Sequence, residues 1–119
     1  MDTNVYLDAN NLIKLKARND AHIGLFYNDV LLYEIVIGGW NNTKSCIRYK
    51  KQGKTINEID HKYCDPTKYV SIHLKIYDNM LYINGTDALF FCIKLDDKIN
   101  FNDIKIKIAS WNKMCKWII

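Results

Sequence analysis

Apolar residues recur at every second position over several long segments of this chain. Ile13, Leu15 and Ala17 alternate with basic residues, and residues 70–77 and 104–108 repeat the same pattern. A period of two sends successive side chains to opposite faces of a strand, so these segments predict half-buried antiparallel strands. No segment carries a sustained helical period. We therefore expect an all-β fold.

Short turn signals rich in Asn, Asp and Gly separate the apolar segments, as at residues 28–29, 38–42 and 78–79. Eight to ten short strands spaced in this way are typical of a β-sandwich or barrel. The 119 residues are the size of one domain, and no linker, repeat or low-complexity segment interrupts them. We predict a single domain over residues 1–119, a sandwich of two antiparallel sheets.

Charge and hydropathy argue against two classes of partner. The formal net charge is +4, and lysines are interleaved with aspartates along the chain, so we expect no nucleic-acid partner. No segment approaches the roughly 20 apolar residues that span a bilayer, and the first dozen residues lack the features of a secretory signal. We expect a cytoplasmic protein with no membrane partner; secretion would follow only if Met1 is not the native start.

The cysteines are widely spaced, at Cys46, Cys64, Cys92 and Cys115. In a chain without a secretory signal we expect free and mostly buried thiols. His61 and Cys64 have a spacing seen in metal sites, but they lack a second pair of ligands. We therefore expect no metal site.

Two adjacent hairpins, with turns centred near residues 28 and 41, bring three polar side chains together. In an antiparallel pair, the numbers of facing residues have a constant sum. The first hairpin then places His22 opposite Glu34, and the second places Glu34 opposite Arg48. In each strand the polar residue lies on the face away from the more apolar set. We predict one polar row across three strands.

The row has two interpretations. A surface salt bridge of Glu34 with His22 and Arg48 would contribute only ~0–1 kcal/mol. Alternatively, the row is a recognition platform in which Glu34 accepts hydrogen bonds while the other two residues donate them. Trp40 follows Gly38-Gly39 at the neighbouring turn and would add an aromatic plane. Sugars, which combine hydroxyl groups with an apolar C–H face, suit such a platform; the alternative for Trp40 is that it plugs the end of the sandwich.

The same stretch resembles a known family. Its residues follow the pattern DAH…YE…IGGW-x-N-x-KS-x-IR, with DAH at 20–22, YE at 33–34 and IGGW at 37–40, and with Asn42, Lys44 and Arg48 in the remainder. This pattern is similar to the signature of the farnesoic acid O-methyltransferase-like domain. The resemblance extends over the whole chain, although the closing segment, residues 111–119, lacks the glycines of the family pattern.

The family name implies methyl transfer from S-adenosylmethionine to farnesoic acid, a step in arthropod juvenile-hormone synthesis. A Rossmann-like methyltransferase alternates strands with helices and has a glycine-rich first loop, whereas this chain has five glycines and no G-x-G-x-x-G. The resemblance also implies modules that accompany extracellular or lectin-like domains, which suits ligand binding better than group transfer. Together with a composition rich in Ile, Lys and Asn, it points to an insect or an insect virus as the source.

Other catalytic arrangements fit the sequence poorly. Ser45, His22 and Asp20 are the right types for a hydrolase triad, but no nucleophile-elbow sequence surrounds Ser45. Glycoside hydrolysis needs a second carboxylate beside Glu34, and the sequence does not place one there. We predict no catalytic residues.

We therefore predict a galectin-like jelly roll that binds a small polar ligand, foremost a sugar, without catalysis or a cofactor. The predicted binding residues are His22, Glu34, Trp40, Asn42, Lys44 and Arg48. One alternative is the methyltransferase of the family name, with S-adenosylmethionine as cofactor. Another is a protein–protein interaction module that uses exposed strands and apolar residues such as Phe26, and self-association stays open.

Overall fold

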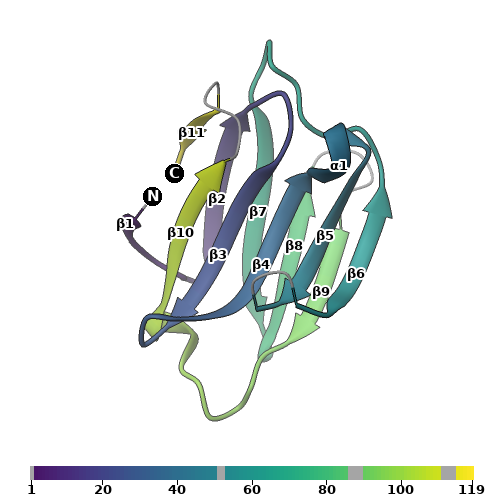
Figure 1. Cartoon of the computed structure of the whole chain (residues 1–119). Helices are drawn as coiled ribbons and strands as arrows, with labels where there is room; N and C mark the ends of the chain where they lie inside the picture. The colour runs from purple at the N-terminus through teal and green to yellow at the C-terminus, as the bar shows by residue number, and fades with distance from the viewer. Residues whose placement is uncertain (1, 51–52, 86–89, 111–114) are drawn as a thin grey trace.

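Two antiparallel sheets pack face to face in the computed structural model of the chain, which describes residues 2–50, 53–85, 90–110 and 115–119 (Figure 1). The six-stranded sheet lies nearer the viewer in Figure 1. Its strands, in spatial order, are β1 (Asp2–Tyr6), β10 (Ile104–Ser110), β3 (Ala21–Tyr27), β4 (Val30–Gly38), β5 (Lys44–Tyr49) and β6 (Thr55–Asp60).

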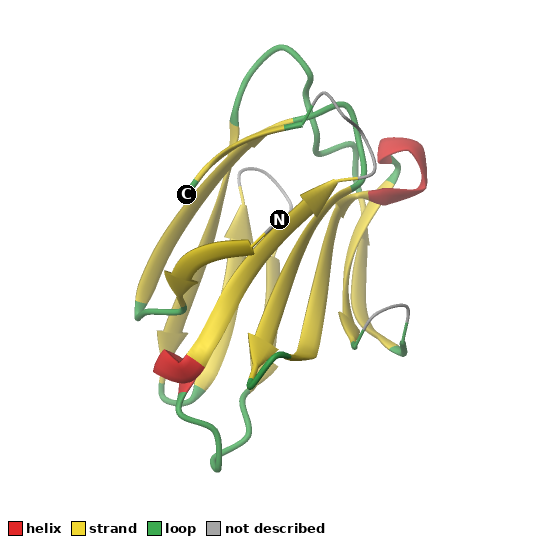
Figure 2. Cartoon of the chain, turned by 60° about the vertical axis from the view of Figure 1, so that its left-hand side comes forward, coloured by secondary structure: helices red, strands yellow, loops and turns green. Residues whose placement is uncertain are grey.

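The five-stranded sheet lies behind it and contains the strands β11 (Lys116–Ile118), β2 (Asn10–Lys16), β7 (Val70–Tyr77), β8 (Met80–Gly85) and β9 (Phe90–Lys94). Two short helical turns, α1 (Gly39–Asn42) and η1 (Phe101–Asp103), lie at opposite ends of the sandwich (Figure 2). Within the described ranges, no helix has the length and apolar character needed to cross a membrane.

The core lies between the two sheets and follows from the alternation of side chains. Ile23, Ile35 and Ile47 face one another across β3, β4 and β5, and each is fully buried. Phe91 and its neighbours on the second sheet are buried against them. Burial of each such side chain contributes roughly 1.5–3 kcal/mol, so the period-two segments supply most of the packing that joins the sheets.

The predicted all-β sandwich of two antiparallel sheets is confirmed. The described residues form eleven strands, slightly more than the eight to ten that the turn signals predicted. Two of the eleven, β1 and β11, are short edge strands, and such strands carry too few residues to display an alternating pattern.

The predicted register is correct for the hairpin of β4 and β5 and wrong for the hairpin of β3 and β4. Glu34 pairs with Arg48 as predicted. His22, however, pairs with Val36, and Glu34 pairs with Gly24. A two-residue turn places Tyr27 opposite Val30, and an irregularity next to Leu25 adds one more residue to β4. The resulting shift of two residues is even, so His22 stays on the same face of the sheet as Glu34.

Candidate functional site

Three polar side chains meet on the outer face of the six-stranded sheet, one from each of β3, β4 and β5. Arg48 donates from Nη2 to Oε1 of Glu34 at 2.5 Å, and Nδ1 of His22 lies 3.1 Å from Oε2 of the same carboxylate. Because Glu34 pairs with Gly24, His22 reaches the carboxylate diagonally, past a residue that has no side chain. The two oxygens of Glu34 are thus used by two different donors. We call these three residues the polar triad.

The polar triad is more buried than the surface salt bridge that its sequence suggested. The side chains of His22, Glu34 and Arg48 are only 14%, 9% and 15% exposed. Burial by itself would raise the pKa of Glu34, but the hydrogen bond from His22 and the positive charge of Arg48 outweigh it and hold that pKa below its ordinary value. The triad is therefore a fixed arrangement of side chains around an ionised Glu34 carboxylate.

The turn after β4 runs through left-handed backbone. Gly38 has φ 64°, and Trp40, Asn41 and Asn42 have φ of 50°, 60° and 62°. A Cβ atom at position 38 would lie 2.5 Å from the sulfur of Cys64, so only glycine fits there. Trp40 is held in a conformation that bulky residues rarely adopt, and half of its surface is exposed. Trp40 therefore stands out from the end of the sandwich and does not plug it.

Asn42 has a structural position within this turn. It is buried, its Nδ2 donates to the carbonyl oxygen of Cys64 at 2.9 Å, and its Oδ1 accepts from the backbone N–H of Cys64 at 2.9 Å. The two bonds attach the turn to the loop that precedes β7. Since both polar atoms of its side-chain amide already form hydrogen bonds with Cys64, we leave Asn42 out of the binding surface proposed below.

The side chain of Lys44 contacts Trp40 and does not belong to the polar triad. Its Nζ lies 4.9 Å from the centre of the Trp40 ring and 3.9 Å from Oε2 of Glu58. Lys44 points to the same side of β5 as Arg48, but the two are four positions apart, or about 13 Å along a strand. Val36 and Cys46 lie between and are buried. The predicted site is therefore two clusters on one face.

The serine and the histidine considered for a hydrolase triad lie on opposite faces of the six-stranded sheet. Ser45 is buried on the inner side of β5, where its Oγ accepts from the N–H of Gly38 at 3.0 Å, whereas His22 faces outward, so the two cannot act as a nucleophile and base. Among the described residues, no three His, Cys, Asp or Glu side chains are grouped to hold a metal ion. Cys46 and Cys64 are buried thiols, whereas Cys92 is partly exposed.

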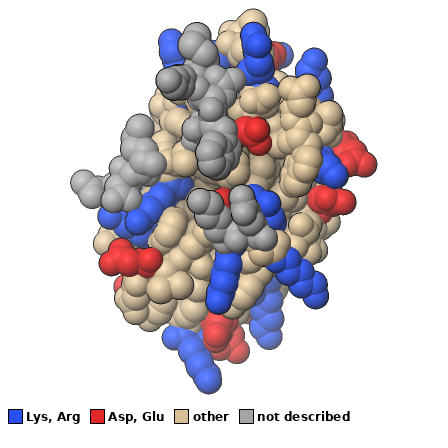
Figure 3. All heavy atoms as spheres, viewed as in Figure 1, with Lys and Arg blue, Asp and Glu red and all other residues tan. Residues whose placement is uncertain are grey.

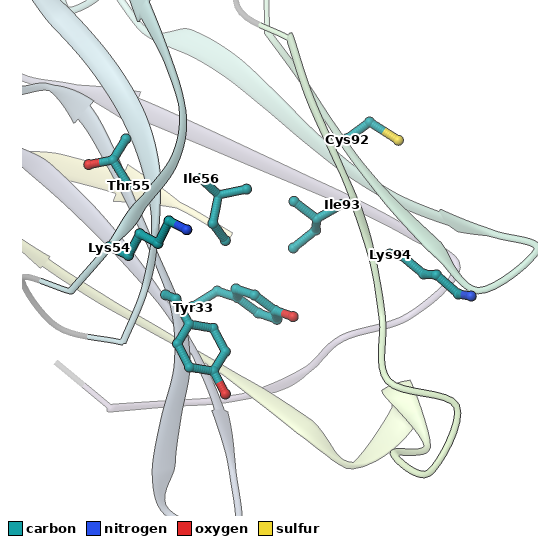
Figure 4. A pocket seen from close by; sticks show the side chains of 8 residues that line it. Tyr33, Lys54, Thr55, Ile56, Cys92, Ile93 and Lys94 are labelled. Atoms are coloured by element: carbon teal, nitrogen blue, oxygen red, sulfur yellow. The ribbon is translucent and has the colours of Figure 1, made fainter.

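A cavity that the sequence did not predict opens between the edge strands β6 and β9. It measures about 560 Å³ and is lined by Tyr33, Tyr49, Lys54, Thr55, Ile56, Cys92, Ile93 and Lys94. Ile56 and Ile93 point toward each other across it, whereas Cys92 and Lys94 turn outward (Figure 4). The rings of Tyr33 and Tyr49 meet edge to face. Among the described strands, none joins β6 to β9, so this side of the core is open. The order of the strands, which the sequence does not give, would have been needed to predict the cavity.

Part of the predicted closing segment, residues 111–114, lies outside the described residues. The remainder forms β11, where Trp117 packs against the core.

The sequence model of the family described as farnesoic acid O-methyl transferase matches residues 3–119. No curated protein matches the sequence. Among solved structures, ancestral congerin Con-anc is similar with a TM-score of 0.59 and 12% identity, over 92% of this chain and 87% of that one. Galectin-Ib of Xenopus laevis is similar with a TM-score of 0.53 and 12% identity, over 98% and 97% of the two chains.

A native glycosidic hydrolase is also similar, with a TM-score of 0.51 and 12% identity, over 86% of this chain and 52% of that one. At these identities the likeness concerns the fold. The galectin-like jelly roll predicted from the sequence is therefore confirmed as the architecture of the chain.

Proposed function

The chain belongs to the farnesoic acid O-methyl transferase family, and we propose that it is a non-catalytic module that binds carbohydrate on the outer face of its six-stranded sheet. The observation that carries the proposal is the pairing, on one face, of a fixed polar triad with a half-exposed tryptophan. Sugar binding uses both: oriented donors and acceptors for hydroxyl groups, and a flat apolar surface for the ring.

The tryptophan is the more informative half of this pair. Trp40 is 50% exposed although its backbone lies at φ 50°, a conformation that costs on the order of 1–3 kcal/mol for a non-glycine residue. Such strain is concentrated at functional sites. Lys44 lies over the ring and adds a hydrogen-bond donor beside it, so the exposed cluster combines an aromatic plane with a charged group.

The spacing of the two clusters sets the size of the ligand. The roughly 13 Å between Lys44 and Arg48 along β5 is too long for one sugar ring, so the ligand we propose is a disaccharide or a longer chain. One unit would stack on Trp40 and another would lie against the part of the polar triad that stays exposed, which is greatest at Arg48, with 15% of its side chain. The likeness in fold to a galectin and to a glycosidic hydrolase supports this class of ligand.

A thermal-shift panel of disaccharides tests the proposal. A disaccharide at about 100 times its dissociation constant should stabilise the protein by about 2.7 kcal/mol. Trp40→Ala and Lys44→Ala should abolish that shift while the far-ultraviolet circular dichroism stays native, because both side chains are exposed at least in part. Tyr77→Ala is the matched control, since Tyr77 is 74% exposed on the other sheet. Absence of a shift with every disaccharide, or a shift that survives both variants, would refute sugar binding here.

A second candidate ligand is farnesoic acid, which the family description names. The cavity between β6 and β9 favours it, because tyrosine and isoleucine side chains would contact an apolar chain and Lys54 would pair with a carboxylate. Thermal shifts with farnesoic acid, for the wild type and for Ile56→Asp, test this ligand. A shift that is lost in Ile56→Asp supports the cavity, and formation of the methyl ester after S-adenosylmethionine is added would identify an enzyme.

A further inference from the structure

The outer face of the five-stranded sheet carries lysines that have no acidic partner among the residues that the structure describes. Because Ile13 and Leu15 of β2 are buried, Lys14 and Lys16 point outward. The same alternation turns five lysines of this sheet outward: Lys14, Lys16, Lys75, Lys94 and Lys116. Among the described strand residues of this sheet, none that faces outward is Asp or Glu, and no described acidic group forms an ion pair with these lysines. We call this surface the basic face.

The register places two of these charges directly against each other. Lys16 of β2 pairs with Lys116 of β11, and Lys14 follows two residues away on the same face. Like charges directly opposite in a sheet are destabilising. Nζ of Lys16 lies 5.0 Å from the centre of the Tyr69 ring, a contact that offsets part of this repulsion. The outer face of the six-stranded sheet differs, because acidic and basic side chains are intermingled there (Figure 3).

Aromatic and amide side chains lie among the lysines of the basic face. Tyr82 pairs with Lys75 across β7 and β8. Phe90, Asn84 and His73 lie in one row across β9, β8 and β7. Tyr77 is 74% exposed and Phe90 is 51% exposed. The basic face thus offers cations, exposed rings and an amide on one open sheet.

We propose that the basic face binds single-stranded nucleic acid. Lysines attract the phosphates, and the rings stack on unpaired bases, which is how sequence-tolerant single-strand binders combine charge with aromatic side chains. An open sheet suits a single strand, because a duplex would keep its bases away from the rings. From the linear distribution of charge we expected no nucleic-acid partner. That expectation considered only the order of charges along the chain. Strand alternation and register gather lysines on one face of the sheet, and none of the described strand residues that share this face is Asp or Glu.

Binding of a labelled oligothymidylate of about 12 nucleotides, a length within the site sizes of single-strand binders, tests the proposal by fluorescence anisotropy at several salt concentrations. Each lysine that neutralises a phosphate contributes about −0.7 to the slope of log affinity against log salt. Lys16→Ala with Lys116→Ala should therefore reduce the magnitude of that slope by about 1.4. The matched control is Lys105→Ala with Lys107→Ala, which removes the same charge from the outer face of the six-stranded sheet and should leave the slope nearly unchanged.

A second variant separates base stacking from charge. Tyr82→Leu should weaken oligothymidylate binding about fivefold or more without changing the salt slope, since no charge is removed. The Lys16→Ala, Lys116→Ala protein should unfold close to the temperature of the wild type, because the repulsion that the change relieves compensates for the Lys16–Tyr69 contact that it removes. Loss of binding in that protein is therefore not a loss of folding.

Three outcomes would overturn the proposal. The first is absence of oligothymidylate binding at low salt. The second is equal loss in the two double-lysine variants, which would indicate net charge alone. The third is binding to phosphatidylserine vesicles that depends on Lys16 and Lys116 while oligothymidylate binding does not, which would assign the basic face to an anionic membrane surface. The sugar site is proposed on the opposite sheet, so the result of the disaccharide experiment does not decide the result of the oligothymidylate experiment.

Discussion

Glu34 and Arg48 face each other directly across β4 and β5, and their side chains form an ion pair of 2.5 Å in which both partners are largely buried. Among the described residues, Nε of Arg48 is also buried and has no acceptor. The carboxylate of Glu34 is therefore the counter-charge that the described part of the sheet gives Arg48. A pair of this kind depends on both members, because the removal of one leaves the other charged and buried.

We expect Glu34→Gln to destabilise the protein by about 3 kcal/mol, the lower end of the range for breaking a buried ion pair. The glutamine keeps the size of the side chain but cannot neutralise Arg48. Urea unfolding at neutral pH measures the change as a lower midpoint with an unchanged slope. Glu58→Gln is the matched control, because Glu58 is 52% exposed and its carboxylate lies 3.9 Å from Nζ of Lys44. This substitution should change the free energy of unfolding by no more than about 0.5 kcal/mol. Equal losses in the two variants would contradict this account of the triad.

The same pair predicts how stability changes with pH. The folded-state pKa of Glu34 lies below its ordinary value of 4.5, so the unfolded chain binds a proton there before the folded chain does. The stabilisation from Glu34 is complete above pH 4.5 and is lost as the pH falls through the folded-state pKa. The difference in unfolding temperature between wild type and Glu34→Gln should therefore narrow as the pH is lowered from about 7 to about 3. Parallel curves over that range would show that the Glu34 carboxyl does not titrate as described.

Period-two alternation was sufficient to predict the sandwich, the strands β3, β4, β5 and β7 and the face on which the polar triad lies. The reason is physical: an error of one residue in register would move every charge of a strand into the core. Register errors of two residues carry no such penalty. The prediction for His22 was wrong by two residues and still placed its ring beside the correct carboxylate.

The rest of the site depends on contacts between distant segments, which alternation does not encode. The bonds of Asn42 join it to a residue 22 positions away, so the sequence could not distinguish it from a surface asparagine of the turn. The depth of the polar triad and the cavity between β6 and β9 likewise follow from how the strands are ordered and covered. The gathering of lysines on the basic face required the register of β2 against β11.

Asn42 and Asn41 form a natural comparison within the left-handed turn. Asn42→Ala should destabilise the protein by about 2–3 kcal/mol, because it leaves a backbone N–H and a carbonyl of Cys64 buried without partners. Asn41 is exposed, and the bond that its side chain forms within the described residues is a long one, 3.4 Å from Nδ2 of Asn19. Asn41→Ala should therefore cost under about 1 kcal/mol. Both residues have positive φ, so backbone strain is similar in the two variants. Thermal unfolding compares them, and similar losses would show that strain, and not the Cys64 contacts, decides the effect.

The thiols should differ in reactivity according to their burial. Burial raises the pKa of Cys64 to about 12 and raises the pKa of Cys46. Since the thiolate is the reactive form, both should resist a disulfide reagent at about pH 8, close to the ordinary pKa of a cysteine thiol, as long as the protein is folded. Cys92 is partly exposed on an edge strand and should react first, which mass spectrometry of the labelled peptides can establish. Labelling of Cys46 and Cys64 should appear only when urea unfolds the sheet, and Cys92→Ser should leave the labelling of these two buried thiols unchanged. Rapid labelling of Cys64 in the folded protein would mean that the loop held by Asn42 opens without global unfolding.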